Sequence, residues 1–211
     1  MAMTSDRLSA TAPADNVSGS RQGHWTYKSY AALPDDGKRY EIVDGVLYMS
    51  PSPGAPHQRI AGRFYYYLLT YVEFIGSGLV FQAPLDVQLT PDRVFQPDVF
   101  VLLNSSLNKY TETCIIGAPD LVIEIASPST AIFDRHEKLE AYAKSGVLEY
   151  WIAEPGTKTV EVLVLHAGTF RSLGIFRGQA SLPSRVVPEI AEVPVEQFFS
   201  IKEAIPPDNL R

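Results

Sequence analysis

The sequence has almost no cysteine and no long apolar run, and both absences narrow its class. A single cysteine, Cys114, among 211 residues excludes an internal disulfide and any zinc site built from several cysteines. No apolar stretch reaches the roughly 18 residues that a membrane-spanning helix needs. The first residues also lack the apolar core of a signal peptide. We therefore expect a cytoplasmic protein without a membrane segment.

Positive charge and familiar catalytic motifs are scarce as well. The chain has 18 Lys and Arg residues against 24 Asp and Glu residues, which gives a formal charge of −6. An acidic chain does not attract nucleic acid through its overall field, so DNA binding would require a local basic surface. The sequence contains no Walker loop, no G-x-G-x-x-G and no G-x-S-x-G motif. Nucleotide binding through those loops and serine-hydrolase chemistry are therefore not indicated.

Length and composition suit one compact domain. The chain is 45% hydrophobic and 11% aromatic, which is ordinary for a folded protein and too apolar for general disorder. Residues 1–23 are mostly small or polar, and we predict that they form a disordered tail. We place a single domain at residues 24–203 and a second short tail at residues 204–211.

The order of the predicted elements favours a mixed α/β (α+β) fold. Asp44-Gly45 lies between two apolar-rich runs, which is typical of a tight hairpin. Ile60, Phe64 and Leu68 form one apolar stripe of a helix that begins near Pro56. Further strands are predicted at 79–82, 85–89, 98–103, 121–126, 147–152 and 159–165, with a helix at 131–144. We expect a mixed central sheet flanked by helices, with an N-terminal hairpin, rather than a doubly wound fold.

Two carboxylates lie in segments that should be buried. Asp98 opens one apolar strand and Glu124 lies inside another, and carboxylates are rarely buried without a partner or a metal. If the strands are neighbours, both side chains could hold Mg²⁺ or Mn²⁺, and the backbone carbonyl of Ile125 could supply a third oxygen. The alternative, equally supported by the residues alone, is that Asp98 caps a turn and Glu124 faces solvent or pairs with a lysine.

Three further residues are weaker candidates, and each has an ordinary interpretation. Lys138 could reach back to the acidic pair and stabilise charge on a phosphate, or could form an i, i+4 surface pair with Asp134. Glu41 could be an additional acidic ligand, although strand alternation favours a solvent-facing residue. His57, near a helix N-terminus, could contact a phosphate, although such a histidine is more often a cap or surface residue.

Several blocks of sequence occur together in an order that is characteristic of a known family. They are Tyr40-Glu41-Ile42-Val43-Asp44-Gly45, Gln96-Pro97-Asp98, the run from Pro119 to Thr130, Glu137-Lys138-Leu139 with Tyr142, and the run from Gly146 to Trp151. Over roughly residues 25–200 the chain resembles the Uma-two family of "putative restriction endonucleases", which is assigned to the PD-(D/E)xK nuclease superfamily.

The resemblance implies specific roles. Pro97-Asp98 corresponds to the "PD" element and Glu124 to the "(D/E)" element, at a separation of 124 − 98 = 26 residues. Ala126 stands where the superfamily pattern has its lysine, and Lys138 on the following helix fits that role instead. Glu41 resembles the acidic residue that many members supply from an early element.

The resemblance therefore implies a Mg²⁺- or Mn²⁺-dependent endonuclease that hydrolyses DNA. Asp98, Glu124 and the Ile125 carbonyl would hold the metal, with Lys138 and Glu41 as further catalytic residues and His57 as a possible phosphate contact. A homodimer is expected, because such enzymes often cut two strands. The alternatives are an inactive nuclease fold that serves as a binding or regulatory protein, and a phosphoesterase with a non-DNA substrate.

Overall fold

Two separate β-sheets organise the protein. The computed structural model describes residues 12–50, 52–126 and 137–200. The first sheet has the strand order β1 (Ala12–Pro13), β3 (Val46–Ser50), β2 (Arg39–Val43), β6 (Arg93–Phe95), β5 (Val87–Thr90) and β8 (Ile115–Ile116). The second has the order β12 (Thr169–Arg177), β11 (Thr159–His166), β10 (Glu149–Glu154), β9 (Leu121–Ile125), β7 (Val99–Leu103) and β4 (Gly78–Gln82).

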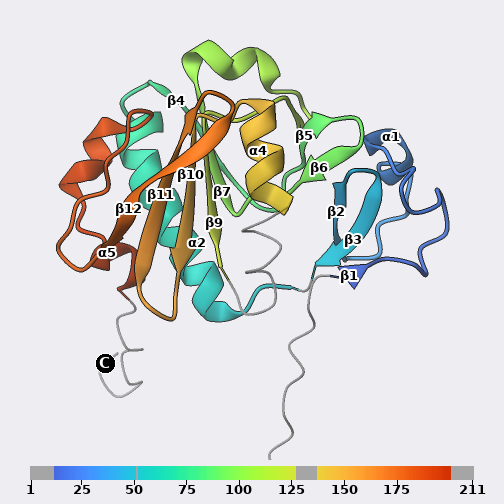
Figure 1. Ribbon diagram of the computed structural model, residues 1–211, viewed down its shortest axis with the longest axis horizontal. Helices are drawn as coiled ribbons and strands as arrows, with labels where there is room; N and C mark the ends of the chain where they lie inside the picture. The colour runs from blue at the N-terminus through green and yellow to red at the C-terminus, as the bar shows by residue number, and fades with distance from the viewer. Residues whose placement is uncertain (1–11, 51, 127–136, 201–211) are drawn as a thin grey trace, which may run out of the picture.

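The second sheet is mixed, as predicted, and helices cover both of its faces (Figure 1). Only β9 and β10 pair in parallel within it, and its other neighbouring strands run antiparallel. The helical elements are α1 (Tyr27–Tyr30), α2 (Ala55–Leu68), the π-helix η1 (Leu69–Glu73), the 3₁₀ helix η2 (Asn104–Lys109), α4 (Leu139–Ser145), the 3₁₀ helix η4 (Pro188–Glu192) and α5 (Glu196–Phe199). No helix in the described ranges is long and apolar enough to cross a membrane.

Side-chain alternation along β9 divides the core into two layers. Leu121, Ile123 and Ile125 pack on the α2 side, and Val122 packs on the α4 side. Because successive strand residues point to opposite faces, Glu124 belongs to the α4 side. The two-sided burial explains why β9 reads as a nearly continuous apolar run. The strand therefore carries a single carboxylate into the layer beneath α4.

The predicted hairpin and the main helix are confirmed. Asp44 and Gly45 both have positive φ at the turn between β2 and β3, as a tight hairpin requires. Helix α2 buries the stripe of Ile60, Phe64 and Leu68 against the sheet. Gly146 ends α4 in the left-handed conformation that favours glycine. Residues 131–136 of the second predicted helix lie outside the described residues.

The predicted N-terminal tail of residues 1–23 is too long, because the chain contacts the first sheet from Ala12 onwards. Strand β1 pairs with β3, and the Ala14 N–H donates to the Leu47 carbonyl. Gln22 also bonds the Leu47 backbone through its side chain. These backbone contacts cannot be seen in a run of small polar residues, which is why composition alone suggested disorder. Residues 1–11 and 201–211 of the predicted tails lie outside the described residues.

Candidate active site

Asp98 and Glu124 lie at the same end of two neighbouring strands. Strands β7 and β9 are antiparallel, with Val99 opposite Ile123. Asp98 directly precedes Val99 and Glu124 directly follows Ile123, so this pairing brings the two residues to the same end of the strand pair. The Ile125 backbone N–H donates to Asp98 Oδ2, which places the Asp98 carboxylate beside the end of β9. Both side chains are buried, as the sequence predicted, at 8% and 2% exposure.

Asp98 is held as a carboxylate by donors on one oxygen. Its Oδ2 accepts a hydrogen bond from the Ile125 backbone N–H at 2.8 Å and lies 3.0 Å from His57 Nε2. Burial, the largest influence, acts to raise the pKa of Asp98, but the His57 contact, the Ile125 N–H and the charge of Lys138 together lower it. The side chain is therefore ionised at neutral pH and available to a cation.

Lys138 joins two of the acidic residues. Its Nζ lies 3.0 Å from Oε1 of Glu124 and 3.1 Å from Oε1 of Glu41. The lysine is only 5% exposed, so the alternative of a surface ion pair is wrong for this residue. Asp134, the partner in that alternative, lies outside the described residues. Burial of any one of these charged groups without a partner would cost much free energy. The contacts between the lysine and the two carboxylates offset that cost.

Glu41 is buried, contrary to the expectation from strand alternation. Its side chain is 4% exposed, and Oε1 accepts the Gln96 backbone N–H at 2.9 Å as well as the contact from Lys138. The side chain is buried because Gln96, which follows β6, and Lys138, which precedes α4, contact its carboxylate. Both residues are distant in sequence, so the alternation of residues along β2 did not predict these contacts.

His57 contacts Asp98 and does not cap the helix. It lies in the first turn of α2, where the N-cap residue is Gly54 and no side chain caps the N-terminus. The imidazole is mostly buried, and its Nδ1 has no hydrogen-bond partner among the described residues. The phosphate contact considered from the sequence therefore stays a prediction, while the observed partner is a carboxylate.

Tyr142 is a member of the cluster that sequence reasoning missed. Its hydroxyl donates to Glu124 Oε1 at 2.9 Å, the oxygen that Lys138 also contacts. In the sequence it stood out only as part of one block of the family resemblance, and no role in the site was assigned to it. The spacing of four residues from Lys138, which puts both side chains on one helix face, was the signal that could have identified it.

The donor set fits a small hard cation held by few protein ligands. Within the described residues, no three His, Cys, Asp or Glu side chains form a ready-made metal cluster. Mg²⁺ is commonly bound through one or two carboxylates, while waters and substrate phosphates fill its other positions. Both described contacts of the Asp98 carboxylate are made by Oδ2, so Oδ1 is the oxygen that would meet a cation. The pair of Asp98 and Glu124 thus suits Mg²⁺ or Mn²⁺.

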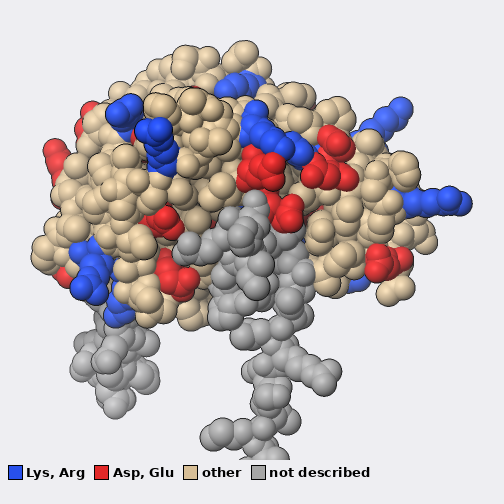
Figure 2. Space-filling view, viewed as in Figure 1, with Lys and Arg blue, Asp and Glu red and all other residues tan. Residues whose placement is uncertain are grey.

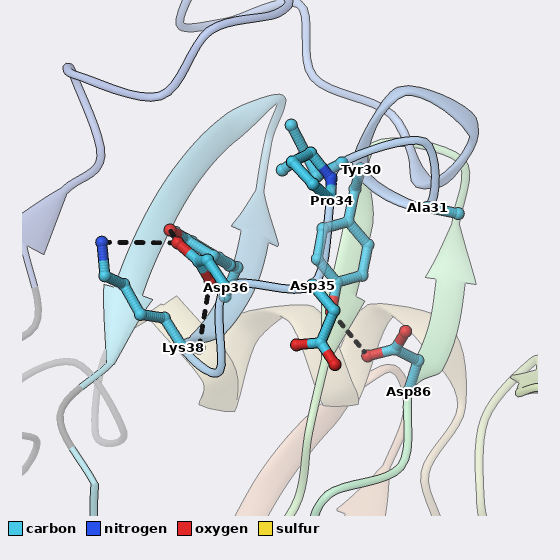
Figure 3. Close-up of a pocket in the computed structure, with 9 residues that line it drawn as sticks. Tyr30, Ala31, Pro34, Asp35, Asp36, Lys38 and Asp86 are labelled. Carbon is cyan, nitrogen blue, oxygen red and sulfur yellow. Dashed lines mark hydrogen bonds and ion pairs between the residues drawn. The ribbon is translucent and has the colours of Figure 1, made fainter.

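A separate acidic pocket lies beside Tyr40 of β2. It has a volume of about 220 Å³, and Tyr30, Asp36 and Asp86 are among its lining residues (Figure 3). The Tyr30 hydroxyl and the Gln96 side-chain amide both donate to Asp86 Oδ1. Burial raises the pKa of Asp86. Gln96 thereby connects this pocket to Glu41, which its backbone N–H also contacts.

Known proteins are similar to this chain in sequence or in structure. The chain is 27% identical over 145 residues to the uncharacterised protein slr1290 of Synechocystis sp., a match that covers 68% of this chain and 74% of that protein. The crystal structure of a "putative nuclease belonging to DUF820" from Anabaena variabilis matches with a TM-score of 0.68 and 22% identity, over 82% of this chain and 97% of that chain. That likeness confirms the predicted restriction-endonuclease-like fold.

The family comparison covers most of the chain. The sequence profile of Uma2, described as "Putative restriction endonuclease", matches residues 27–196 and so includes every residue of the candidate site. The predicted resemblance is confirmed, and the chain belongs to the Uma2 family.

Proposed function

We propose that this chain is a divalent-cation-dependent endonuclease that hydrolyses phosphodiester bonds of DNA. The observation that carries the proposal is that one buried lysine, Lys138, contacts two buried carboxylates, Glu41 and Glu124, and that its charge also lowers the pKa of a third, Asp98. Asp98 and Glu124 would hold Mg²⁺ or Mn²⁺, with the Ile125 carbonyl as a third ligand. Membership of a family described as restriction endonucleases supports the same reaction class.

The residues of the cluster have separate tasks in this proposal. A bound divalent cation supplies neutralisation of phosphate charge and acidifies the attacking water. Lys138 orients that water or stabilises the negative charge that develops on the phosphate. Glu41 holds the lysine from the first sheet, and His57 fixes Asp98 through Oδ2.

The distribution of charge keeps a second candidate in view. On the face shown in Figure 2, Lys and Arg side chains are interspersed with Asp and Glu rather than gathered into one basic surface. A typical DNA-binding protein gathers Lys and Arg on one surface. The mixed charges, together with the formal charge of −6, therefore support a non-DNA phosphodiester substrate or a binding role as the second candidate. The proposed homodimer would double whatever local basic surface each copy offers.

Cleavage of supercoiled DNA by the purified chain tests the proposal. We expect nicking in Mg²⁺ or Mn²⁺ that is lost in Asp98→Asn, Glu124→Gln and Lys138→Met and retained in Glu140→Gln, whose carboxylate is exposed on α4. Nicking that survives Lys138→Met would contradict the role of the lysine alone.

The same proteins distinguish the substrates. A DNA enzyme should weaken steeply as salt rises, whereas turnover of a small phosphodiester should change little. Wild-type protein that cleaves neither DNA nor a small phosphodiester, with either metal, would support the binding role and contradict the proposed enzyme.

A further inference from the structure

Tyr142 lies on α4, one helical turn after Lys138, and both side chains point to β9. The Tyr142 hydroxyl donates to Glu124 Oε1 at 2.9 Å, and Lys138 Nζ contacts the same oxygen at 3.0 Å. Two donors of different character therefore converge on one oxygen of a carboxylate that we place on the metal.

Aromatic packing fixes the position of the Tyr142 hydroxyl. The tyrosine is completely buried, and its ring lies 5.3 Å from that of Phe95 and 5.2 Å from that of Tyr150 between centroids. Burial, followed by the charge of Glu124, raises the pKa of Tyr142 well above its usual value. The hydroxyl therefore keeps its proton at neutral pH and acts only as a donor to the carboxylate.

Among the described residues Lys138 contacts two carboxylates, whereas the described hydrogen bond of Tyr142 goes to Glu124 alone. Nζ of the lysine also lies 3.1 Å from Glu41 Oε1. In the proposed reaction the lysine must further turn toward water or phosphate, which weakens its hold on Glu124. A tyrosine fixed by its neighbours has no such competing task.

We propose that Tyr142 is a positioning residue that holds Glu124 in its metal-binding orientation while Lys138 is engaged elsewhere. The proposal rests on the metal-dependent function proposed above and adds a residue to it. Groups that hydrogen-bond metal ligands typically change metal affinity or activity by ~10–100-fold when they are removed. The Tyr142 hydroxyl should therefore act on metal affinity more than on the rate at saturating metal.

Tyr40→Phe is a matched control for Tyr142→Phe. Tyr40 is also buried, and its hydroxyl also donates to a carboxylate oxygen, that of Asp36 at 2.8 Å, but it packs in the core beneath the first sheet. Each substitution removes one hydroxyl–carboxylate bond and keeps the ring. If only Tyr142→Phe weakens metal binding, the effect is specific to the hydrogen bond to Glu124 and does not follow from the loss of any hydroxyl–carboxylate bond.

Titration of the full chain with Mn²⁺ in a calorimeter measures the effect without any cleavage. We expect the Mn²⁺ dissociation constant to rise ~10–100-fold in Tyr142→Phe and to stay at the wild-type value in Tyr40→Phe. The Mn²⁺ concentration for half-maximal DNA cleavage should rise by the same factor, and the rate at saturating Mn²⁺ should be nearly restored. A third variant with 4-aminophenylalanine at position 142 keeps an N–H donor and should recover wild-type affinity even if the phenylalanine variant folds poorly.

The outcomes separate this inference from the function on which it rests. Wild-type Mn²⁺ affinity in Tyr142→Phe, with metal-dependent cleavage by the wild-type protein, would overturn the role of Tyr142 and leave the proposed function intact. Equal weakening in Tyr142→Phe and Tyr40→Phe would overturn it too. A wild-type protein that neither binds Mn²⁺ nor cleaves DNA would instead refute the proposed function itself.

Discussion

Replacement of Lys138 by methionine should strongly destabilise the metal-free protein. The substitution keeps an apolar chain of similar length but removes the charge that lies 3.0 and 3.1 Å from the two glutamates. The three side chains are between 3% and 6% exposed, so solvent cannot replace the lost cation. Removal of one partner from a buried ion pair typically costs about 3–5 kcal/mol, which is a large part of the stability of an ordinary domain.

Lys144→Met on the same helix is the matched control. Lys144 pairs with Glu140 at 2.5 Å, but the two side chains are 55% and 66% exposed. Exposed pairs at this spacing contribute about 0.3–0.5 kcal/mol. Unfolding in urea, followed by circular dichroism without metal, should therefore separate the two lysines by several kcal/mol in the free energy of unfolding. A loss of less than about 1 kcal/mol in Lys138→Met would refute the reasoning, because that is the range of solvent-exposed pairs.

A second substitution tests whether the carboxylates left without Lys138 cause the loss of stability. In the Lys138→Met background, Glu41→Gln removes one of the two uncompensated charges and should recover part of the stability. In the wild-type background the same change removes an ion pair and should destabilise. Equal effects of Glu41→Gln in both backgrounds would show that Lys138 and Glu41 are not coupled.

Three other perturbations have expected results. Burial raises the pKa of Tyr40 to about 12, so its contribution to stability is complete below pH 10 and is lost as the pH rises toward that value; the melting temperature should fall over this range, and less so in Tyr40→Phe. The pKa of Asp98 is lowered, so the ionised side chain contributes stability at pH values above the ordinary pKa of aspartate, and this stability is lost as the pH falls through the lowered pKa. The melting temperature should therefore fall less at acid pH in Asp98→Asn than in the wild type. Glu149 accepts hydrogen bonds from Trp151, Ser184 and two backbone N–H groups, so Glu149→Ala should cost about 3 kcal/mol in urea unfolding.

The sequence predicted the features that depend on neighbouring residues in the chain, namely the buried strand, the hairpin turn and the two carboxylates inside apolar segments. The apolar continuity of residues 121–126 predicted a strand buried on both faces, and the structure places β9 in the middle of its sheet. Asp44-Gly45 predicted the hairpin because few other residues adopt positive φ at both turn positions. A carboxylate inside such a strand must find a partner, so Asp98 and Glu124 could be singled out before any pairing was known.

Long-range packing determined the rest of the candidate site. The burial of Glu41 depends on β6 and on Lys138, which are distant in sequence, and alternation along β2 contains no information about them. The contact of His57 with Asp98 depends on how the first turn of α2 lies against the residue that precedes β7. Tyr142 was not assigned to the site because an aromatic ring can pack in a core whether or not its hydroxyl has a partner.

The most direct test of the proposed metal site is a crystal structure of the full chain grown with Mn²⁺. Anomalous scattering locates the ion without reference to activity. We predict a peak that contacts Asp98 and Glu124 beside the Ile125 carbonyl and disappears in Asp98→Asn. Strong Mn²⁺ peaks elsewhere on the protein, with none between these two carboxylates, would contradict the assignment of the active site.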